Sequence, residues 1–296
     1  MGVARFLCGW EALGVEVNEY LLARPSPALR QYVAHYSGYR QRGIAPGRHR
    51  GLPSPYLTLI LTLDEPLVVA AHPDPRQAPG RYDALVGGLH VAPALIVHDG
   101  CSSGVQVAVN PLGCRALFGL PAGELANLDT DFAAVAGEAL VAEIRERMLL
   151  ADSWPARFTV VDRALCRLAL SHRADVHPDV ARAFRRLVAA GGDVQISTLA
   201  DEVGWSPRHL TNRFAAEVGL RPKEAARVVR FDRVRRKIVP GVRLAEVAAE
   251  AGYFDQSHLV RDFQAFAGCS PTQWLADEIG FVQAESALLD EDYRHD

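Results

Sequence analysis

The chain has 296 residues, a formal net charge of −3 and 49% hydrophobic residues, as an ordinary soluble globular protein does. This length is enough for two domains, each with its own core. Apolar runs fall short of the roughly 20 residues of a membrane span, and the first residues lack a secretory or myristoylation signal. We therefore expect a cytoplasmic protein without a membrane partner.

The cysteines are scattered along the chain and have neither C-x-x-C nor metal-ligand spacing: Cys8, Cys101, Cys114, Cys166 and Cys269. This pattern predicts reduced, mostly buried thiols, and neither a bound metal nor a cofactor. Phosphate-binding glycine loops, nucleophile elbows and H-E-x-x-H motifs are missing from the sequence, so catalysis is not expected.

The acidic balance of the chain comes from its end. Residues 277–296 hold seven acidic residues and one arginine, whereas residues 193–274 hold 12 basic and 10 acidic residues. A weakly acidic total charge therefore does not exclude a nucleic-acid partner for the region before this tail.

The first half of the chain changes from a strand pattern to a helix pattern. The sequence pattern of residues 1–50 is irregular, apart from one helix-like stretch over 28–36. Short apolar runs bounded by turn residues then predict strands over 57–63, 67–71, 89–98 and 104–110. Strands at this spacing are typical of a small antiparallel sheet or half-barrel.

Helical periodicity follows over 112–118, 138–150 and 157–171, and Asp179 is the expected N-cap of a further helix over 180–190. Two glycines, Gly191 and Gly192, then interrupt the chain. We expect an α+β protein with an effector-sensing or dimerisation domain (1–190), an all-α domain (191–276) and an acidic tail (277–296).

A sequence pattern is duplicated in the second half. The copies run over 199–214 and 247–263, and their glycines, Gly204 and Gly252, lie 48 positions apart. His209, Leu210, Phe214, Gly219 and Pro222 recur 49 positions later, which indicates one residue inserted in the turn. Two copies in register predict a pair of helix-turn-helix units.

In the first copy, Ser197 is the expected N-cap of a helix that ends before Gly204. Ser206 is the expected cap of the next helix, with Pro207 at its first position. Since Leu210 and Phe214 face the core, three polar side chains face outward toward base edges in a major groove: Arg208, Thr211 and Asn212.

In the second copy, Asp255 is the expected cap, and Leu259 and Phe263 are the expected buried pair. The outward side chains are then Gln256, Ser257, Val260 and Arg261. Gln pairs with adenine, Arg with guanine, and Val contacts a thymine methyl group.

Between the copies, residues 223–239 predict one basic helix of roughly 26 Å at about 1.5 Å per residue. Such a helix would hold the two units near one DNA turn apart, about 34 Å. The residues expected at phosphates are Ser206, Arg213, Arg230, Arg233, Arg236 and His258. These residues could instead have structural roles. The basic helix face could be merely solvated, Arg213 could form an ion pair, and His209 and His258 could pack against their neighbours.

Residues 195–275 resemble the DNA-binding domain of the AraC/XylS family of bacterial transcription regulators, most specifically over 252–263 and 268–271. The resemblance implies two helix-turn-helix units that read adjacent major-groove segments of double-stranded promoter DNA. The seven outward residues correspond to base-contacting positions of the family, where Asn212 departs from a frequent arginine. Segment 111–121 is similar to sequences that precede this domain in one subgroup.

In that family the N-terminal domains bind a small effector, dimerise, or both, and RNA polymerase is a further partner. Two other functions remain open. One is a constitutive or architectural DNA-binding protein without a ligand. The other is a DNA-repair enzyme fused to the same domain, but such enzymes need a four-cysteine zinc cluster, and the cysteines of this chain are too dispersed to form one.

Overall fold

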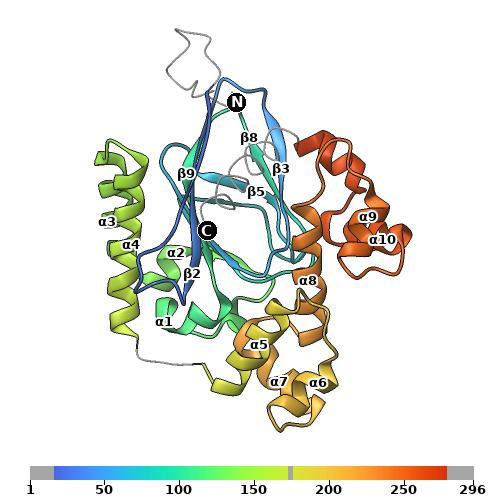
Figure 1. The fold of residues 1–296 in the computed structure, drawn as a ribbon. Helices are drawn as coiled ribbons and strands as arrows, with labels where there is room; N and C mark the ends of the chain where they lie inside the picture. The colour runs from blue at the N-terminus through green and yellow to red at the C-terminus, as the bar shows by residue number, and fades with distance from the viewer. Residues whose placement is uncertain (1–16, 173–175, 279–296) are drawn as a thin grey trace.

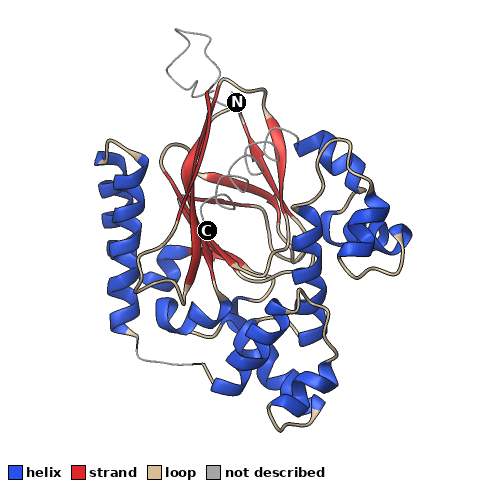
Figure 2. Ribbon diagram, viewed as in Figure 1, coloured by secondary structure: helices blue, strands red, loops and turns tan. Residues whose placement is uncertain are grey.

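The computed structural model describes residues 17–172 and 176–278 (Figure 1). Ten strands lie in the described part of the first half, from residue 17 onward: β1 Val17–Ala23, β2 Val33–Arg42, β3 Gly47–Gly51, β4 Leu57–Thr62, β5 Leu67–Ala71, β6 Gly80–Tyr82, β7 Ala84–Gly87, β8 Ala94–His98, β9 Ser102–Val109 and β10 Asp129–Asp131. The helices lie around these strands and beyond them (Figure 2). The expected α+β class is confirmed.

The strands form two antiparallel sheets. The larger has the order β1-β2-β9-β4-β7-β10, and the smaller has the order β3-β8-β5-β6. The strands expected over 57–63, 67–71 and 104–110 are confirmed as β4, β5 and β9 with small shifts at their ends. Of the strand expected over 89–98, only 94–98 is extended, as β8.

The helix expected over 28–36 is wrong. The chain makes a hydrogen-bonded turn, in which the Val33 N–H donates to the Leu29 carbonyl at 2.8 Å, and then continues as β2. Leu29, Val33 and Tyr36 are all buried and have helical spacing. A β-bulge between Val33 and His35 brings Val33 and Tyr36 to the same face of β2. The other face of β2 is polar and lines a cavity, so the strand shows no regular apolar alternation and its pattern resembles that of a helix.

Helices of the N-terminal domain (residues 17–172) pack on the outer face of the larger sheet. They are α1 Cys114–Phe118, α2 Phe132–Ala136, α3 Glu138–Leu150 and α4 Trp154–Ser171, with short 3₁₀ turns at Pro111–Gly113 (η1) and Ala122–Leu125 (η2). Phe158 of α4 stacks on Tyr36 of β2 with ring centroids 6.1 Å apart. A Cβ on Gly38 would lie 2.5 Å from the Trp154 ring, so glycine permits this close approach.

The C-terminal part is helical. It contains α5 Pro178–Ala189, α6 Ile196–Glu202, α7 Pro207–Val218, α8 Pro222–Arg235, α9 Leu244–Glu250 and α10 Gln256–Ala267, and residues 271–278 are also helical. Among the described residues, no helix is long and apolar enough to cross a membrane. Asp277 and Glu278 continue the last helix, and the rest of the expected acidic tail lies outside the described residues.

Three helix ends differ from expectation. The N-cap of α5 is His177, whose Nδ1 accepts from the Asp179 N–H at 3.3 Å, so Asp179 is inside the helix. The N-cap of α6 is Gln195 and not Ser197. The connecting helix ends at Arg235, four residues earlier than the periodicity indicates, and a turn through Pro240 and Gly241 leads to α9.

Candidate nucleic-acid interface and the adjoining cavity

Two helix pairs repeat the same local geometry. We refer to α6–α7 as the first unit and to α9–α10 as the second unit. Ser206 caps α7 by accepting from the His209 N–H at 3.2 Å, and Asp255 caps α10 by accepting from the His258 N–H at 2.6 Å. The two caps inferred from the sequence are therefore confirmed.

The turn of each unit is fixed by a glycine and an aromatic ring. Gly204 has φ of +69°, which a side chain rarely adopts, and the next residue, Trp205, packs edge-on against His209 with ring centroids 4.6 Å apart. Tyr253 and His258 repeat this contact at 5.1 Å in the second unit. Both imidazoles therefore pack against their own turns.

The outward-facing positions expected from the sequence lie on α7 and α10. Five are exposed and two, Thr211 and Val260, are half-buried: Arg208, Thr211, Asn212, Gln256, Ser257, Val260 and Arg261. The Thr211 hydroxyl donates to the Pro207 carbonyl at 2.7 Å, which leaves its oxygen as an acceptor. On the opposite side, Leu210, Phe214, Leu259 and Phe263 are fully buried.

Two arginines of α8, Arg227 and Arg230, pack against the second unit. Arg227 pairs with Asp262 of α10 at 2.6 Å and lies over the Phe266 ring at 4.9 Å. Arg230 donates to the Gly192 carbonyl at 3.1 Å and lies over the Tyr253 ring at 5.5 Å. These two cations therefore hold α10 and its turn against the connecting helix.

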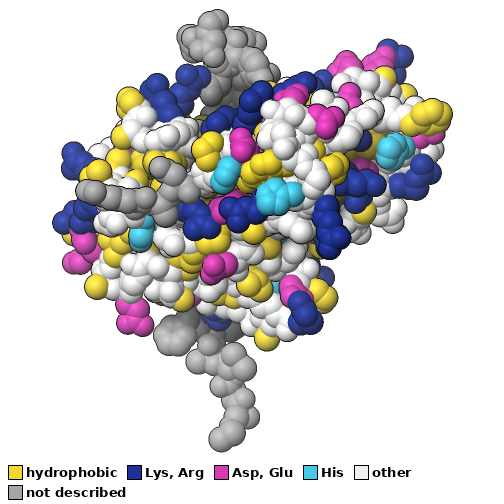
Figure 3. Space-filling model, turned by 90° about the horizontal axis from the view of Figure 1, so that it is seen from below, with side chains coloured by type: hydrophobic (Ala, Val, Ile, Leu, Met, Phe, Trp, Pro, Cys, Tyr) yellow, Lys and Arg dark blue, Asp and Glu magenta, His cyan; other side chains and the backbone are white. Residues whose placement is uncertain are grey.

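The residues expected at phosphates are in different surroundings. Ser206, Arg213 and Arg233 are exposed and His258 is half-buried. Arg236 pairs with Asp232 through two nitrogens at 3.0 Å and lines the cavity described below. Basic and acidic side chains are interspersed over the face shown in Figure 3. The positions of single arginines therefore indicate possible phosphate contacts better than the net charge does.

A cavity of about 670 Å³ lies between the two sheets. Its polar wall includes the inward side chains of β2, which are His35, Ser37, Tyr39 and Gln41. The smaller sheet contributes aliphatic side chains, among them Leu67, Val69, Ala94 and Ile96. Sequence reasoning missed this site, although polar residues at every second position from His35 to Gln41 are a signal that could have revealed it.

Helix α8 and helix 271–278 close one side of the cavity. Asp232 and Arg235 of α8 and its C-cap residue Arg236 line it, as do Trp274 and Glu278. Burial lowers the pKa of His98, with the nearby His49 adding to the effect, and burial also lowers the pKa of His90. The neutral imidazoles can donate and accept hydrogen bonds, so the cavity suits a ligand with both polar and apolar parts.

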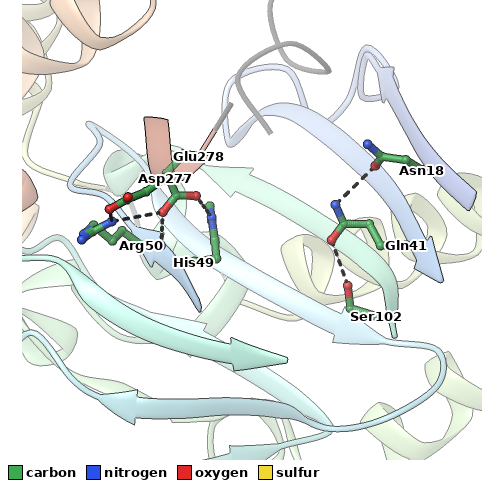
Figure 4. A network of polar contacts seen from close by, with 7 residues as sticks. All are labelled: Asn18, Gln41, His49, Arg50, Ser102, Asp277 and Glu278. Atoms are coloured by element: carbon green, nitrogen blue, oxygen red, sulfur yellow. Dashed lines mark hydrogen bonds and ion pairs between the residues drawn. The ribbon is translucent and has the colours of Figure 1, made fainter. Parts of the chain in front are cut away.

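Two groups of ion pairs and hydrogen bonds are among the contacts between the C-terminal helices and the N-terminal domain. Arg115 of α1 holds Glu217 of α7 with both nitrogens, at 2.7 and 2.9 Å. Glu278 binds His49 and Arg50 of β3 (Figure 4). The first contact lies at the first unit, and the second lies at the helix that follows the second unit.

The sequence of this C-terminal region matches a known domain model. Residues 199–277 match the model described as "Helix-turn-helix domain", which spans both units. Residues 199–277 therefore form a helix-turn-helix domain similar to that of the AraC/XylS family of transcription regulators. Residues 22–131 match a second model, described as "Domain of unknown function (DUF6597)".

Individual relatives cover different shares of the chain. The curated "Uncharacterized HTH-type transcriptional regulator YbfI" of Bacillus subtilis is 30% identical over 67 residues, which is 23% of this chain and 24% of that protein. The match therefore spans about a quarter of the relative.

Among solved structures, ToxT from Vibrio cholerae has a TM-score of 0.47 and 10% identity over 81% of this chain and 96% of its own. The C-terminal domain of AraT, a response regulator from Geobacillus stearothermophilus, has a TM-score of 0.32 and 21% identity over 34% of this chain and 86% of its own.

Proposed function

We propose that this protein is a sequence-specific transcription regulator that reads two adjacent major-groove segments of promoter DNA. One observation carries the proposal: two helices with the same type of side-chain cap present the seven outward residues, while their opposite faces are buried. A capped helix whose polar side chains reach outward is the element that enters a major groove.

The roles of the residues follow from their surroundings. Arg208, Thr211 and Asn212 of the first unit contact base edges, as do Gln256, Ser257, Val260 and Arg261 of the second. Ser206, Arg213, Arg233 and His258 contact phosphates. Arg230 also contacts a phosphate, from its position against the second unit. We assign Arg236 to the cavity because it pairs there with Asp232.

We further propose that residues up to 190 form a sensing domain and that residues 191–276 form the DNA-binding domain. The cavity supports this division of labour, since it is lined by β2 and also by α8, which braces the second unit. A small molecule in the cavity would therefore contact both domains. RNA polymerase and a second copy of the chain are further partners that we propose for a regulator of this family.

Selection of binding sites from genomic fragments by the purified chain tests the proposal, with and without a metabolite extract. We expect recovered fragments that share two short motifs about one helical turn apart, and an extract that changes their affinity. Ser37→Phe, which fills the cavity at a buried position of β2, should retain the motifs and lose the response. Fragments without a shared motif would contradict sequence-specific reading, and an extract without effect would favour the constitutive alternative.

A further inference from the structure

The helix 271–278 inserts a carboxylate into the edge of the cavity. The Glu278 side chain is 1% exposed, and its Oε2 lies 2.6 Å from the His49 Nδ1. Its Oε1 accepts from the Arg50 backbone N–H at 2.9 Å and lies 3.7 Å from the Arg50 guanidinium. The same guanidinium holds Asp277 at 2.9 Å. Figure 4 shows both acidic side chains directed at β3.

This arrangement has the composition of a carboxylate-binding site. Burying an ionised carboxylate costs several kcal/mol unless both oxygens have partners. Here β3 supplies a backbone N–H, an imidazole nitrogen and a guanidinium to one carboxylate. The donors belong to the N-terminal domain, and the carboxylate belongs to the helix that follows the second unit.

The site is connected to the cavity and to α10. His49, Arg50, Trp274 and Glu278 all line the cavity, so a molecule bound there reaches the same donors. Trp274 is buried and packs against Phe263 of α10 with ring centroids 5.6 Å apart. Movement of helix 271–278 therefore changes the packing behind the recognition helix of the second unit.

We propose that β3 forms a carboxylate-binding site, that Glu278 occupies it as an intramolecular ligand, and that an effector carrying its own carboxylate competes with Glu278. Displacement of Glu278 releases helix 271–278 and loosens the second unit. The first unit keeps its own contact through Arg115 and Glu217, which do not line the cavity. The effector part of this inference rests on the proposed function.

Chemical rescue followed by hydrogen-exchange mass spectrometry tests the site in the full chain without DNA. Glu278→Ala should raise the exchange rate of the peptide over 271–278 by roughly tenfold, because its docking contact is lost. Acetate at about 100 mM should occupy the vacated site by mass action and slow the exchange of a peptide over β3. Acetamide at the same concentration has the same size without the charge and should have no effect.

Two further variants keep the test decisive. Asp201→Ala removes an exposed acidic residue of α6 and should leave both peptides unchanged. Glu278→Gln keeps an acceptor for the Arg50 N–H and loses the charge, so it should give an intermediate exchange rate even if the alanine variant folds poorly. Unchanged exchange over 271–278 in both Glu278 variants, or equal effects of acetate and acetamide, would overturn the proposal.

The same variants separate this inference from the proposed function. In an anisotropy titration with a selected two-segment DNA, Glu278→Gln should weaken binding at the second segment by roughly threefold to tenfold, a change of about 1 kcal/mol. A wild-type chain that binds no DNA specifically would reject the proposed function and leave the acetate result standing. Specific binding that Glu278→Gln leaves unchanged would reject the link to the second unit.

Discussion

Arg115 and Glu217 form a two-point ion pair between α1 of the N-terminal domain and α7 of the first unit, with nitrogen–oxygen distances of 2.7 and 2.9 Å. The two residues lie 102 positions apart in the chain. The Arg115 side chain is 28% exposed and that of Glu217 is 9% exposed. The position of the first recognition helix is therefore fixed relative to the N-terminal domain, and not only within its own unit.

We expect Glu217→Gln to lower the free energy of unfolding by about 1–3 kcal/mol, because it leaves a partly buried guanidinium without its charge partner. A double-mutant cycle with Arg115→Met, measured by urea denaturation, should give a coupling energy of roughly 0.5–3 kcal/mol. Glu143→Gln, which disrupts exposed pairs with Arg147 and Arg167, is the matched control and should cost less than about 1 kcal/mol. Equal losses at both sites would show that the α1–α7 pair has no special role.

The helix-turn-helix units were predictable from the sequence, whereas the uses of the α8 arginines were not. Ser206 and Asp255 cap their helices as the sequence predicts, because capping depends on residues that are neighbours in the chain. Arg227 and Arg236 both read as part of a basic helix face, yet their partners, Asp262 and Asp232, are fixed by tertiary packing or helical register. The spacing of charged residues in the sequence predicts which helix face they occupy, but it does not predict which residues they contact.

The cavity was missed for a related reason. Periodicity searches detect apolar faces, and β2 presents a polar inner face from His35 to Gln41 beside a buried outer residue, Tyr36. Its outer face then imitates a helix. The contact of Glu278 with His49 spans 229 positions and depends on the packing of a C-terminal helix on β3. A local sequence pattern cannot predict a contact between residues so far apart in the chain.

Base contact by Arg261 can be distinguished from phosphate contact. Arg261 is exposed on α10, and its replacement by alanine should cost about 1–3 kcal/mol at the cognate site and relax preference at one base position. Competition against singly substituted sites measures both effects. Arg213→Ala is the matched control and should weaken binding evenly across sequences. An even loss for Arg261→Ala would instead identify a phosphate contact.

The salt dependence of DNA binding should distinguish Arg233 of α8 from Arg236, the C-cap residue of the same helix. Arg233 is exposed, so Arg233→Ala should reduce the slope of log affinity against log salt by about 0.9, the loss of one phosphate contact. Arg236 pairs with Asp232 and lines the cavity, so Arg236→Ala should leave the slope unchanged. Titrations between about 50 and 200 mM salt test both. A reduced slope for Arg236→Ala would return this residue to the DNA interface.

The Cys114 thiol should make stability fall at alkaline pH. Burial raises the pKa of Cys114 to about 12, whereas an unfolded cysteine ionises near 8.5. Above roughly pH 8.5 the unfolded state loses a proton that the folded state keeps, so stability is lost as pH rises toward 12. Between pH 8.5 and 10 the wild type should lose about 1–2 kcal/mol more than Cys114→Ala in urea denaturation. Cys101→Ala controls for loss of a thiol, and parallel curves for wild type and Cys114→Ala would contradict the expectation.

The first unit should set the base preference that is particular to this chain, since the resemblance to the AraC/XylS family leads us to expect an arginine where this chain has Asn212. Asn pairs with adenine, whereas Arg pairs with guanine. Asn212 is exposed on α7 between the buried residues Leu210 and Phe214, so the substitution requires no repacking of the core. Asn212→Arg should therefore change the preferred base at one position of the first segment from adenine to guanine and leave the second segment unaltered.

Selection from DNA randomised at the first segment measures this change. Asp201→Arg, at an exposed position of α6, adds positive charge away from the recognition helix and serves as the control. It should strengthen binding to all sequences alike, because added charge acts on phosphates without reading bases. An Asn212→Arg variant that recovers the wild-type sequences would show that Asn212 does not contact a base, and specificity at the first segment would then depend on Arg208 and Thr211.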